Sequence, residues 1–466
     1  MAPWSSPLTQ WCNNLRRRKP APLSVVPIGL ACVTSFLILF YVSLTFDSCF
    51  FHLTKIHVDP HPSPVVVVQH QLNNTINAND EDHPIVNNAQ PSSVLPELTQ
   101  LTSPSKGSTE SKHHKKKYED EVYHDKEIFY QNYKEMKTSL KIYIYPHNKN
   151  DPFANALLPT NDYYQPSGNY ASEAYFKNVL FKSHFITNDP SEADLFFLPF
   201  SIANLRHDHR VGVRGLPDFI FNYMTNITQN YPYWNRTGGA DHFYAACHSI
   251  GKLAMEKVDQ VKSNAIQVIC SSSYFLTNYY AHKDVSLPQI WPRHEEPLDL
   301  ASTSKRKKLA FYAGTAISPL RKAVVKTWEN DSSISVHGGR LKTPYSEHLL
   351  GCKYCLHIKG FEVNTARIGD AFYYGCVPVI LADYYDLPFM DILNWKSFSV
   401  VITSSDIPNL KIILQSISPK KYSILQANVL KARKHFKWND SPLDFDAFYM
   451  VMYELWLRKT SIRVLS

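Results

Sequence analysis

The pattern of hydrophobic and polar positions divides this chain into three parts. Residues 23–46 are uncharged and mostly apolar, residues 47–137 are rich in Pro, Asn, Ser, Thr and charge, and from there on short apolar runs alternate with amphipathic stretches. At the helical rise the first run spans roughly 36 Å, which is enough to cross the hydrocarbon core of a bilayer. The pattern therefore predicts a single transmembrane helix, a flexible stem and a folded head.

The charges around the apolar run predict its orientation. The cluster Arg16-Arg17-Arg18-Lys19 precedes it, and only Asp47 and the distant Lys55 follow. By the positive-inside rule residues 1–22 are a cytosolic tail, residues 23–46 a signal anchor, and the rest of the chain lumenal or extracellular. A cleaved signal peptide is the alternative, but its apolar region is usually about 7–15 residues long and ends in small residues. This run ends in Leu44-Thr45-Phe46, which favours the anchor.

The polar stretch of residues 47–137 carries few regular apolar repeats. Such a segment buries too little apolar surface to offset the entropy of ordering it, so we expect a disordered stem. A short helix over residues 125–136 is expected to end it.

Two cycles of strand and helix patterns follow the stem. The first has a β-rich run at residues 141–146, an amphipathic pattern at 172–181 and an apolar run at 195–200. The second has apolar runs at 309–314, 354–358 and 377–381 and a helix pattern at 320–328. Alternating strands and helices predict parallel sheets covered by helices. We expect an α/β fold of two lobes, residues 138–282 and 283–430, with residues 431–466 forming a C-terminal helix that packs back on the lobes.

Composition and charge narrow the range of partners. The chain of 466 residues is 44% hydrophobic and 13% aromatic, which suits two packed domains. The 49 Lys and Arg exceed the 41 Asp and Glu only slightly, and part of the excess lies in the cytosolic tail and at residues 112–117. Nucleic acid is therefore not an expected partner, whereas an anionic sugar nucleotide or an acidic polysaccharide remains possible.

Glycosylation sequons and cysteines agree with a lumenal head. Cys247 and Cys270 are candidates for a disulfide in an oxidising compartment. Cys352 and Cys355 have the C-x-x-C spacing, but a zinc site needs a second pair of ligands, so we expect ordinary buried thiols and no metal site. The acceptor pattern for N-glycosylation occurs at Asn73, Asn226, Asn235, Asn330 and Asn439.

The stretch CLHIKGFEVNTARIGD at residues 355–370 is the strongest candidate for chemistry. It predicts a strand, a loop at Lys359 and Gly360, and a helix that starts near Asn364 or Thr365. A helix start with free N–H groups favours an anion, and the planar fork of Arg367 suits a diphosphate. Asp370 is spaced to accept hydrogen bonds from ribose hydroxyls. The alternative is a capped helix with an exposed ion pair, which the spacing does not exclude.

The same stretch, followed by GCVPVIL, resembles the donor-binding signature of the exostosin family of glycosyltransferases. Other similar motifs occur in order: KIYIYPH, YASEAYF, DPSEADLFFLPFS, YPYWNRTGGADHF, KDVSLP, FYAG and LNWKSFSV. The resemblance covers roughly residues 138 to 430 and is strongest to the plant branch that builds cell-wall polysaccharides.

The resemblance implies an inverting, metal-independent transferase of the two-lobed GT-B type. It implies Rossmann-like lobes, the N-terminal one on the acceptor side and the C-terminal one binding a nucleotide-sugar donor. The expected donor is a UDP sugar, which acts as co-substrate without further cofactor. By position, Arg367 matches a diphosphate-contacting Arg, Asp370 the acidic residue that holds the ribose, and Arg321 a second phosphate-side Arg.

The chain departs from the family pattern in the donor loop and after the FYAG motif. Ile358-Lys359-Gly360 replaces Pro-Ser-Gly, Asp370 replaces Glu, and Ala316-Ile317-Ser318 replaces a His-Gly pair. Lys359 offers a point charge in place of lost phosphate contacts. These departures support an alternative, a catalytically silent subunit that assembles or targets an active glycosyltransferase. A lumenal carbohydrate-binding protein is a third and weaker hypothesis.

An inverting transfer needs a base, which in this architecture normally comes from the first lobe. His242 and Asp241, in a turn-rich stretch after an aromatic run, are the first candidates, and a structural hydrogen-bonded pair is the alternative. Glu173 is a third candidate, although first-turn Glu residues often only cap a helix. The D-x-D at Asp444 and Asp446 lacks a preceding hydrophobic strand, so we interpret it as a helix start, not a metal site.

Together these features predict a single-pass type II glycosyltransferase of the Golgi membrane with a lumenal head. Its expected partners are a nucleotide-sugar donor, a polysaccharide or glycan acceptor and the membrane, and other glycosyltransferases are candidate partners.

Overall fold

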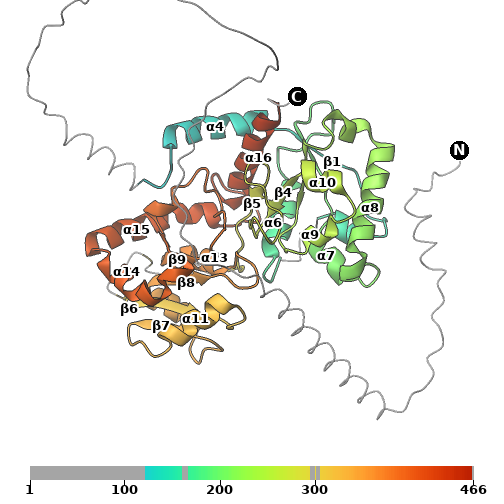
Figure 1. Ribbon diagram of the computed structural model, residues 1–466. Coiled ribbons are helices and arrows are strands. Elements are labelled where there is room, and N and C mark those ends of the chain that lie inside the picture. Colours follow the sequence, from blue (N-terminus) through green and yellow to red (C-terminus); the bar gives the residue numbers. More distant parts are fainter. Residues whose placement is uncertain (1–120, 160–165, 294–296, 298–299, 301–304, 464–466) are drawn as a thin grey trace, which may run out of the picture. The chain divides into compact units, whose positions relative to one another are not determined.

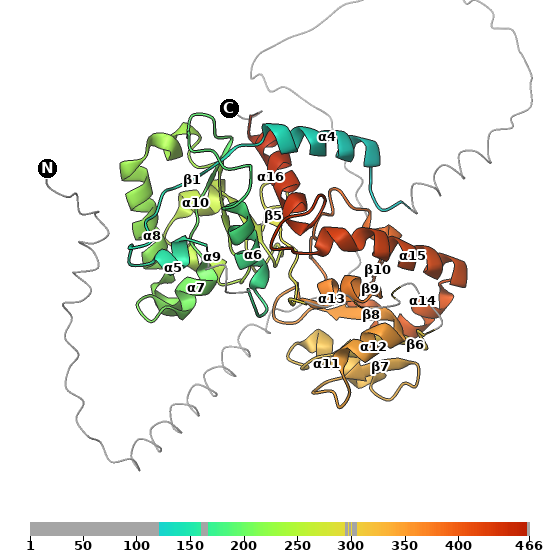
Figure 2. The same ribbon diagram turned by 180° about the vertical axis from the view of Figure 1, so that it is seen from behind.

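The computed structural model describes residues 121–159, 166–293, 297, 300 and 305–463 (Figures 1 and 2). The predicted anchor, most of the predicted stem and Asn73 lie outside these residues. Within the described part of the chain, no helix combines the length and apolar character that a membrane crossing requires.

The first lobe is built on a parallel sheet with the strand order β1-β2-β3-β4-β5. An isolated parallel bridge joins Ile186 to Ile142, which is also paired with Leu195 of β2. The segment at Ile186 therefore lies on the other side of β1, and the order of the chain reverses at β1 as in doubly wound sheets. The strands are β1 (Ile142–Ile144), β2 (Leu195–Phe197), β3 (His242–Ala245), β4 (Ile266–Ile269) and β5 (Val285–Ser286).

The strands of this sheet are short, and those at its centre are buried along their whole length. Burial on both faces is typical of a parallel sheet between helices, and it explains why these segments read as continuous apolar runs. The helices of this lobe are α5 (Ala154–Leu157), α6 (Ala171–Leu180), α7 (Ile202–His207), α8 (Gly212–Asn230), η1 (Pro232–Arg236), α9 (Gly251–Ala254) and α10 (Asp259–Asn264).

The second lobe has its own parallel sheet with the order β10-β9-β8-β6-β7. The chain order reverses between β6 and β8, so both lobes are Rossmann-like, as expected. Its strands are β6 (Lys308–Ala313), β7 (Ile334–His337), β8 (Cys352–Ile358), β9 (Val377–Leu381) and β10 (Val400–Val401). Its helices are α11 (Pro319–Trp328), α12 (Tyr345–Gly351), α13 (Arg367–Tyr373), η2 (Trp395–Ser397), η3 (Ser404–Asn409), α14 (Leu410–Ser416), α15 (Pro419–Ala432) and η4 (Arg433–Phe436). The first sheet extends to Ser286, a few residues beyond the expected lobe boundary at residue 282.

Two helices from opposite ends of the head pack together. α4 (Lys126–Ser139) begins after Asp125, whose side chain accepts the N–H of Ile128 at 2.9 Å. It packs on α16 (Ala447–Arg463), with the rings of Phe129 and Tyr453 5.1 Å apart (Figure 1). The expected helix at residues 125–136 is confirmed. The stem was predicted to be disordered as far as residue 137, and that limit was wrong because an apolar face of α4 is buried against α16.

The D-x-D motif forms a helix start, as expected. The Asp446 carboxylate accepts the N–H of Tyr449 at 3.1 Å and the side-chain amide of Asn439 at 2.9 Å. α16 then packs against β5, so the C-terminal helix returns to the first lobe.

The cysteines are only partly as expected. Cys247 and Cys270 form a disulfide that joins the ends of β3 and β4. Cys355 forms a second disulfide with Cys376, and Cys352 remains a buried thiol. The prediction of a free thiol at Cys355 was wrong because the adjacent strands β8 and β9 bring Cys376 next to it. The three sulfur atoms are the one group with metal-ligand spacing in the described residues, but the disulfide removes two of the thiolates that a zinc site requires.

The sequon asparagines differ in exposure. Asn235 and Asn330 are exposed, whereas Asn226 and Asn439 are partly buried. The Asn439 side-chain amide also donates to Asp446, whose carboxylate accepts the N–H of Tyr449 in the first turn of α16. Asn235 and Asn330 are therefore the sites most open to a glycan.

Glu454 on α16 generates a test of the packing of this helix. Burial raises the pKa of Glu454 from about 4.5 to about 8. Because the folded-state pKa is raised, folding favours the protonated acid, and stability falls as the pH rises from about 4.5 to about 8. We expect Glu454→Gln to raise the free energy of unfolding by about 1–3 kcal/mol at pH 7 and to change little at pH 4. Denaturant unfolding at both pH values measures it, with the exposed Glu347→Gln as control. A gain in the free energy of unfolding that is the same at both pH values would contradict the raised pKa of Glu454.

Candidate active site

A cavity of about 760 Å³ lies between the two lobes. On the second lobe it meets the carboxyl ends of β6 and β8, where the strand order reverses and where open α/β sheets bind ligands. Its lining comes from both lobes and includes Asn169, Tyr170, His248, Gln289, Trp291, Arg293, Gly314, Thr315, Arg321, Tyr345, Gly360, Phe361, Glu362, Asn364, Thr365, Arg367 and Asp370.

Two guanidinium groups are fixed in the floor of this cavity. Arg321, in the first turn of α11, donates from Nε to the Ile358 carbonyl at 3.2 Å. Arg367, at the start of α13, donates from Nε and Nη2 to the Ala313 carbonyl at 3.2 and 2.8 Å. Both partners are main-chain carbonyls at the ends of β6 and β8, so the sheet itself positions the two cations.

Neither cation is held directly by a carboxylate of the described residues. Burial raises the pKa of the nearby Asp370, and the charge of Arg367 opposes that rise. Among the residues that the structure describes, neither Arg321 nor Arg367 forms an ion pair with a carboxylate. Burial lowers the pKa of Arg321, and the positive charge of Arg367 lowers it further. Arg321 is buried and Arg367 is partly buried. Two like charges held in such a place are unfavourable until an anion neutralises them. The planar forks of both residues suit the oxygens of a diphosphate.

Glycines make room for both guanidinium groups. A Cβ atom on Gly314 would overlap Nη2 of Arg367, and one on Gly360 would lie 2.6 Å from Nη2 of Arg321. A larger residue at either position would therefore displace the guanidinium group from where it lies. The sequence predicted the role of Gly360 in the donor loop but did not single out Gly314.

A buried histidine fixes the donor loop. His357 Nε2 lies 2.9 Å from the Val363 carbonyl, which can only accept, so this nitrogen carries the hydrogen. Its Nδ1, 3.2 Å from the Thr365 hydroxyl, then accepts the hydroxyl hydrogen. Burial lowers the pKa of His357 to about 3, which keeps the ring neutral. Thr365 lines the cavity as predicted, but its hydrogen is donated to His357 and not to the cavity.

The remaining predicted donor residues differ in placement. Asp370 lines the cavity and forms an ion pair with Arg293, whose Nη2 lies 2.7 Å from Oδ1 of Asp370. A contact of Asp370 with a ribose would therefore be shared with that cation. Lys359 does not line the cavity. Its carbonyl instead accepts from the hydroxyl of Ser318, which caps α11.

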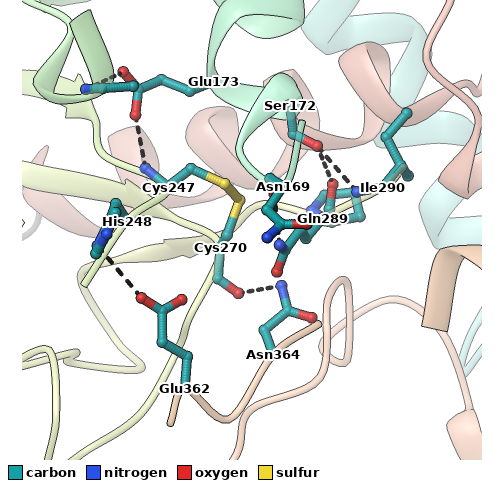
Figure 3. Close-up of a disulfide and its surroundings, with 12 residues drawn as sticks. Asn169, Ser172, Glu173, Cys247, His248, Cys270, Gln289, Ile290, Glu362 and Asn364 are labelled. Carbon is teal, nitrogen blue, oxygen red and sulfur yellow. Dashed lines mark hydrogen bonds and ion pairs between the residues drawn. A yellow bond between two sulfur atoms is a disulfide. The ribbon is translucent and has the colours of Figure 1, made fainter. Parts of the chain in front are cut away.

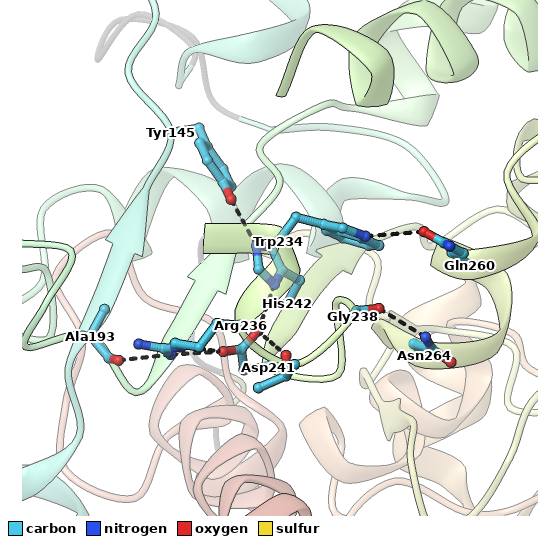
Figure 4. Close-up of polar contacts among 10 residues, drawn as sticks. Tyr145, Ala193, Trp234, Arg236, Gly238, Asp241, His242, Gln260 and Asn264 are labelled. Carbon is cyan, nitrogen blue, oxygen red and sulfur yellow. Dashed lines mark hydrogen bonds and ion pairs between the residues drawn. The ribbon is translucent and has the colours of Figure 1, made fainter. Parts of the chain in front are cut away.

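The two residues predicted as candidates for the catalytic base, His242 and Asp241, lie elsewhere in the first lobe (Figure 4). The His242 side chain is 0% exposed, and its ring nitrogens lie 2.8 Å from the Tyr145 hydroxyl and 2.7 Å from the Asp241 carboxylate. Asp241 is further paired with Arg236. Neither predicted residue lines the cavity.

The polarity of the parallel sheet explains this placement. His242 opens β3, and the amino ends of parallel strands lie at the edge opposite their carboxyl ends, whereas the cavity is reached by His248, after the carboxyl end of the same strand. The structure therefore corrects the expectation for His242 and Asp241, which form a buried structural network. Glu173 also lies outside the cavity lining, buried and accepting from the Ser201 hydroxyl at 2.6 Å and the Cys247 N–H at 2.9 Å.

Two titratable residues that sequence reasoning missed face each other across the lobes (Figure 3). Glu362, in the donor loop, accepts the N–H of Ser249 at 3.0 Å and lies 3.5 Å from Nδ1 of His248. The Tyr170 hydroxyl also bonds to Glu362, and burial raises the pKa of its carboxyl group. Asn364 of the same loop donates to the Cys270 carbonyl at 2.5 Å. The position of Glu362 two residues after the donor-loop Gly360 was the available signal.

Gly314, against which the Arg367 guanidinium group lies, provides a test of the cation pair. We expect Gly314→Ala to displace the Arg367 guanidinium group, because the new methyl group would occupy its place, and to weaken UDP binding about tenfold or more. Titration calorimetry measures the affinity, and circular dichroism verifies the fold. Gly339→Ala is the matched control, since a Cβ there meets no atom within 4 Å. Equal losses in both variants would refute a local effect.

Residues 136–417 match the family described as the Exostosin GT47 domain. The chain is 35% identical over 352 residues to "Probable glycosyltransferase At5g03795" of Arabidopsis thaliana, covering 74% of this chain and 66% of that protein. It is 26% identical over 307 residues to "Probable beta-1,4-xylosyltransferase IRX10L" of the same plant, covering 61% and 74%. A solved structure, Anabaena Alr3699/HepE in complex with UDP, covers 69% of this chain and 100% of that one at 11% identity, with a TM-score of only 0.29. On the family match, which spans the head from before β1 into the helices after β10, this chain belongs to the exostosin GT47 family of glycosyltransferases.

Proposed function

We propose that this protein is an inverting, metal-independent glycosyltransferase of GT-B type that moves a sugar from a UDP sugar to a polysaccharide acceptor. The single observation that carries the proposal is the pair Arg321 and Arg367, held by main-chain carbonyls in the cavity between the lobes without an acidic partner among the described residues. A diphosphate supplies the missing negative charge. The adjacent pair of Arg293 and Asp370 is then positioned to face the ribose.

The same cations support independence from metal. When the bond between the sugar and the diphosphate breaks, negative charge grows on the leaving phosphate. Two preorganised guanidinium groups can stabilise that charge directly, which is the task of a divalent cation in other transferases.

The acceptor class and the location are inferred from the relatives and from the chain itself. The name of IRX10L describes a xylosyltransferase, and by extension we propose a cell-wall matrix polysaccharide or related glycan as acceptor. Two disulfides and exposed sequons suit an oxidising lumen, so we place the head in the Golgi lumen on a type II anchor, where it can meet other glycosyltransferases.

A catalytically silent subunit is not favoured. The departures from the family pattern at Lys359 and at residues 316–318 leave the cation pair in place, because Ser318 caps α11 and bonds to the Lys359 carbonyl. Residues of both lobes also line the cavity.

Removing one guanidinium group tests the donor site. We expect Arg367→Ala to weaken UDP binding about 10- to 100-fold, because it removes charge-assisted hydrogen bonds to the diphosphate. Titration calorimetry on the full-length protein in detergent measures it. Arg340→Ala, which removes the same charge from an exposed position, is the control. Unchanged affinity in Arg367→Ala would remove the assignment.

Chelation of metal ions tests whether the arginines alone supply the positive charge that turnover needs. We expect excess EDTA to leave the initial rate within about twofold of the untreated enzyme, since the arginines supply the charge stabilisation. Release of UDP from a panel of UDP sugars, with plant cell-wall oligosaccharides as acceptors, measures the rate. Loss of activity with EDTA and recovery with a divalent cation would show that the transferase depends on metal.

A further inference from the structure

The reaction needs a group that takes the proton of the acceptor hydroxyl, and the predicted histidine lies outside the cavity. A direct displacement by a sugar hydroxyl is slow unless a base removes this proton as the new bond forms. Three side chains among those lining the cavity have a pKa low enough to leave a lone pair available near neutral pH, namely Asp370, His248 and Glu362.

Asp370 is occupied by a cation. Its Oδ1 lies 2.7 Å from Nη2 of Arg293, and the carboxylate is buried. Protonating it would leave the Arg293 guanidinium group partly unpaired, which is unfavourable where water is scarce. This pairing makes Asp370 a binding group and a poor proton acceptor.

His248 already carries its hydrogen on the nitrogen that is left free. Nδ1 accepts the N–H of Ile250 at 3.1 Å, so in the neutral ring the hydrogen lies on Nε2. Burial, with the nearby Arg206 and His207, lowers the pKa of His248 to about 4 and keeps the ring neutral. The ring also stacks on Tyr170 at 4.5 Å between centroids. His248 can therefore donate a hydrogen bond to a substrate but has no free lone pair to accept a proton.

Glu362 remains, and its place in the chain suits the task. It lies two residues after Gly360, against which Nη2 of Arg321 lies. The Cα of Glu362 is therefore within about 7 Å of the Cα of Gly360. The N–H of Ser249 and the hydroxyl of Tyr170, both from the first lobe, hold its carboxylate. The carboxylate is thus fixed between the proposed diphosphate and the acceptor-side lobe.

We propose that Glu362 is the catalytic base of the transfer, an inference that rests on the proposed function. Its carboxylate takes the proton of the acceptor hydroxyl while that oxygen forms a bond to the anomeric carbon. The bond from the anomeric carbon to the diphosphate oxygen breaks, and its electron pair stays on UDP, held by Arg321 and Arg367. The anomeric configuration inverts, and the proton ends on Glu362.

The surroundings of Glu362 favour this role. The charged and titratable groups that act on it are Arg206, His248 and Tyr170, and the other contact is Ser249. Burial outweighs these hydrogen bonds and the positive charge and raises the pKa of Glu362 above its ordinary value, which strengthens it as a base.

The test uses an acceptor that has no proton to lose. Full-length protein in detergent is assayed with the UDP sugar that the wild type uses, once with a hydroxyl acceptor and once with azide. We expect Glu362→Gln to lower turnover with the hydroxyl acceptor about 10²- to 10⁴-fold, to keep transfer to azide within a few-fold, and to bind UDP as the wild type does. The exposed Glu347→Gln is the matched control.

The other outcomes separate the two proposals. A wild type that neither binds UDP nor transfers any sugar overturns the proposed function itself. An active wild type with equally active Glu362→Gln overturns the assignment of the base alone. Loss of azide transfer and UDP binding together with hydroxyl transfer would show that Glu362 only positions the donor loop, because a positioning role does not distinguish the two acceptors.

Discussion

The head depends on the unneutralised charge of two arginines at the carboxyl ends of β6 and β8. Each guanidinium group is held by main-chain carbonyls of those strands, and each occupies space that a glycine leaves open. Holding the buried Arg321 and the partly buried Arg367 close together costs free energy, which burial of the apolar strands beneath them must offset. An anion with two or more negative charges relieves that cost, and this couples the packing of the sheet to donor binding.

The polarity of parallel strands decides which residues line the cavity. Each lobe presents the carboxyl ends of its strands to ligands, so residues that follow a strand line the cavity and residues that precede one do not. His248 and His242 flank the same strand, and only His248 reaches the cavity. The second histidine instead completes a buried network with Tyr145 and Asp241 that stabilises the far edge of the first sheet.

The donor loop also joins the two lobes by polar contacts at the cavity. Asn364 bonds to the carbonyl of the disulfide residue Cys270 (Figure 3). Glu362 bonds to the N–H of Ser249, two residues after Cys247. The disulfide holds the ends of β3 and β4 together, so both contacts meet one rigid surface. A base placed in this loop is aligned by both lobes at once, and any change in their relative position would move it.

The family resemblance supplied Arg321, and the expected oxidising compartment suggested the pairing of Cys247 with Cys270. The pattern of the chain predicted the two α/β lobes, the helix at the D-x-D motif, and Arg367 and Asp370 as candidates. These follow from local hydrophobic periods, capping residues and motif spacing, which neighbouring residues in the chain fix between them. Only the three-dimensional arrangement brought Glu362 into the cavity between the lobes, joined Cys355 to Cys376, placed Arg367 against Gly314 and directed the hydrogen of Thr365 to His357. Each of these depends on which atoms from distant segments come within a few ångströms of one another, and the order of strands in a sheet, not the order of residues in the chain, sets those distances.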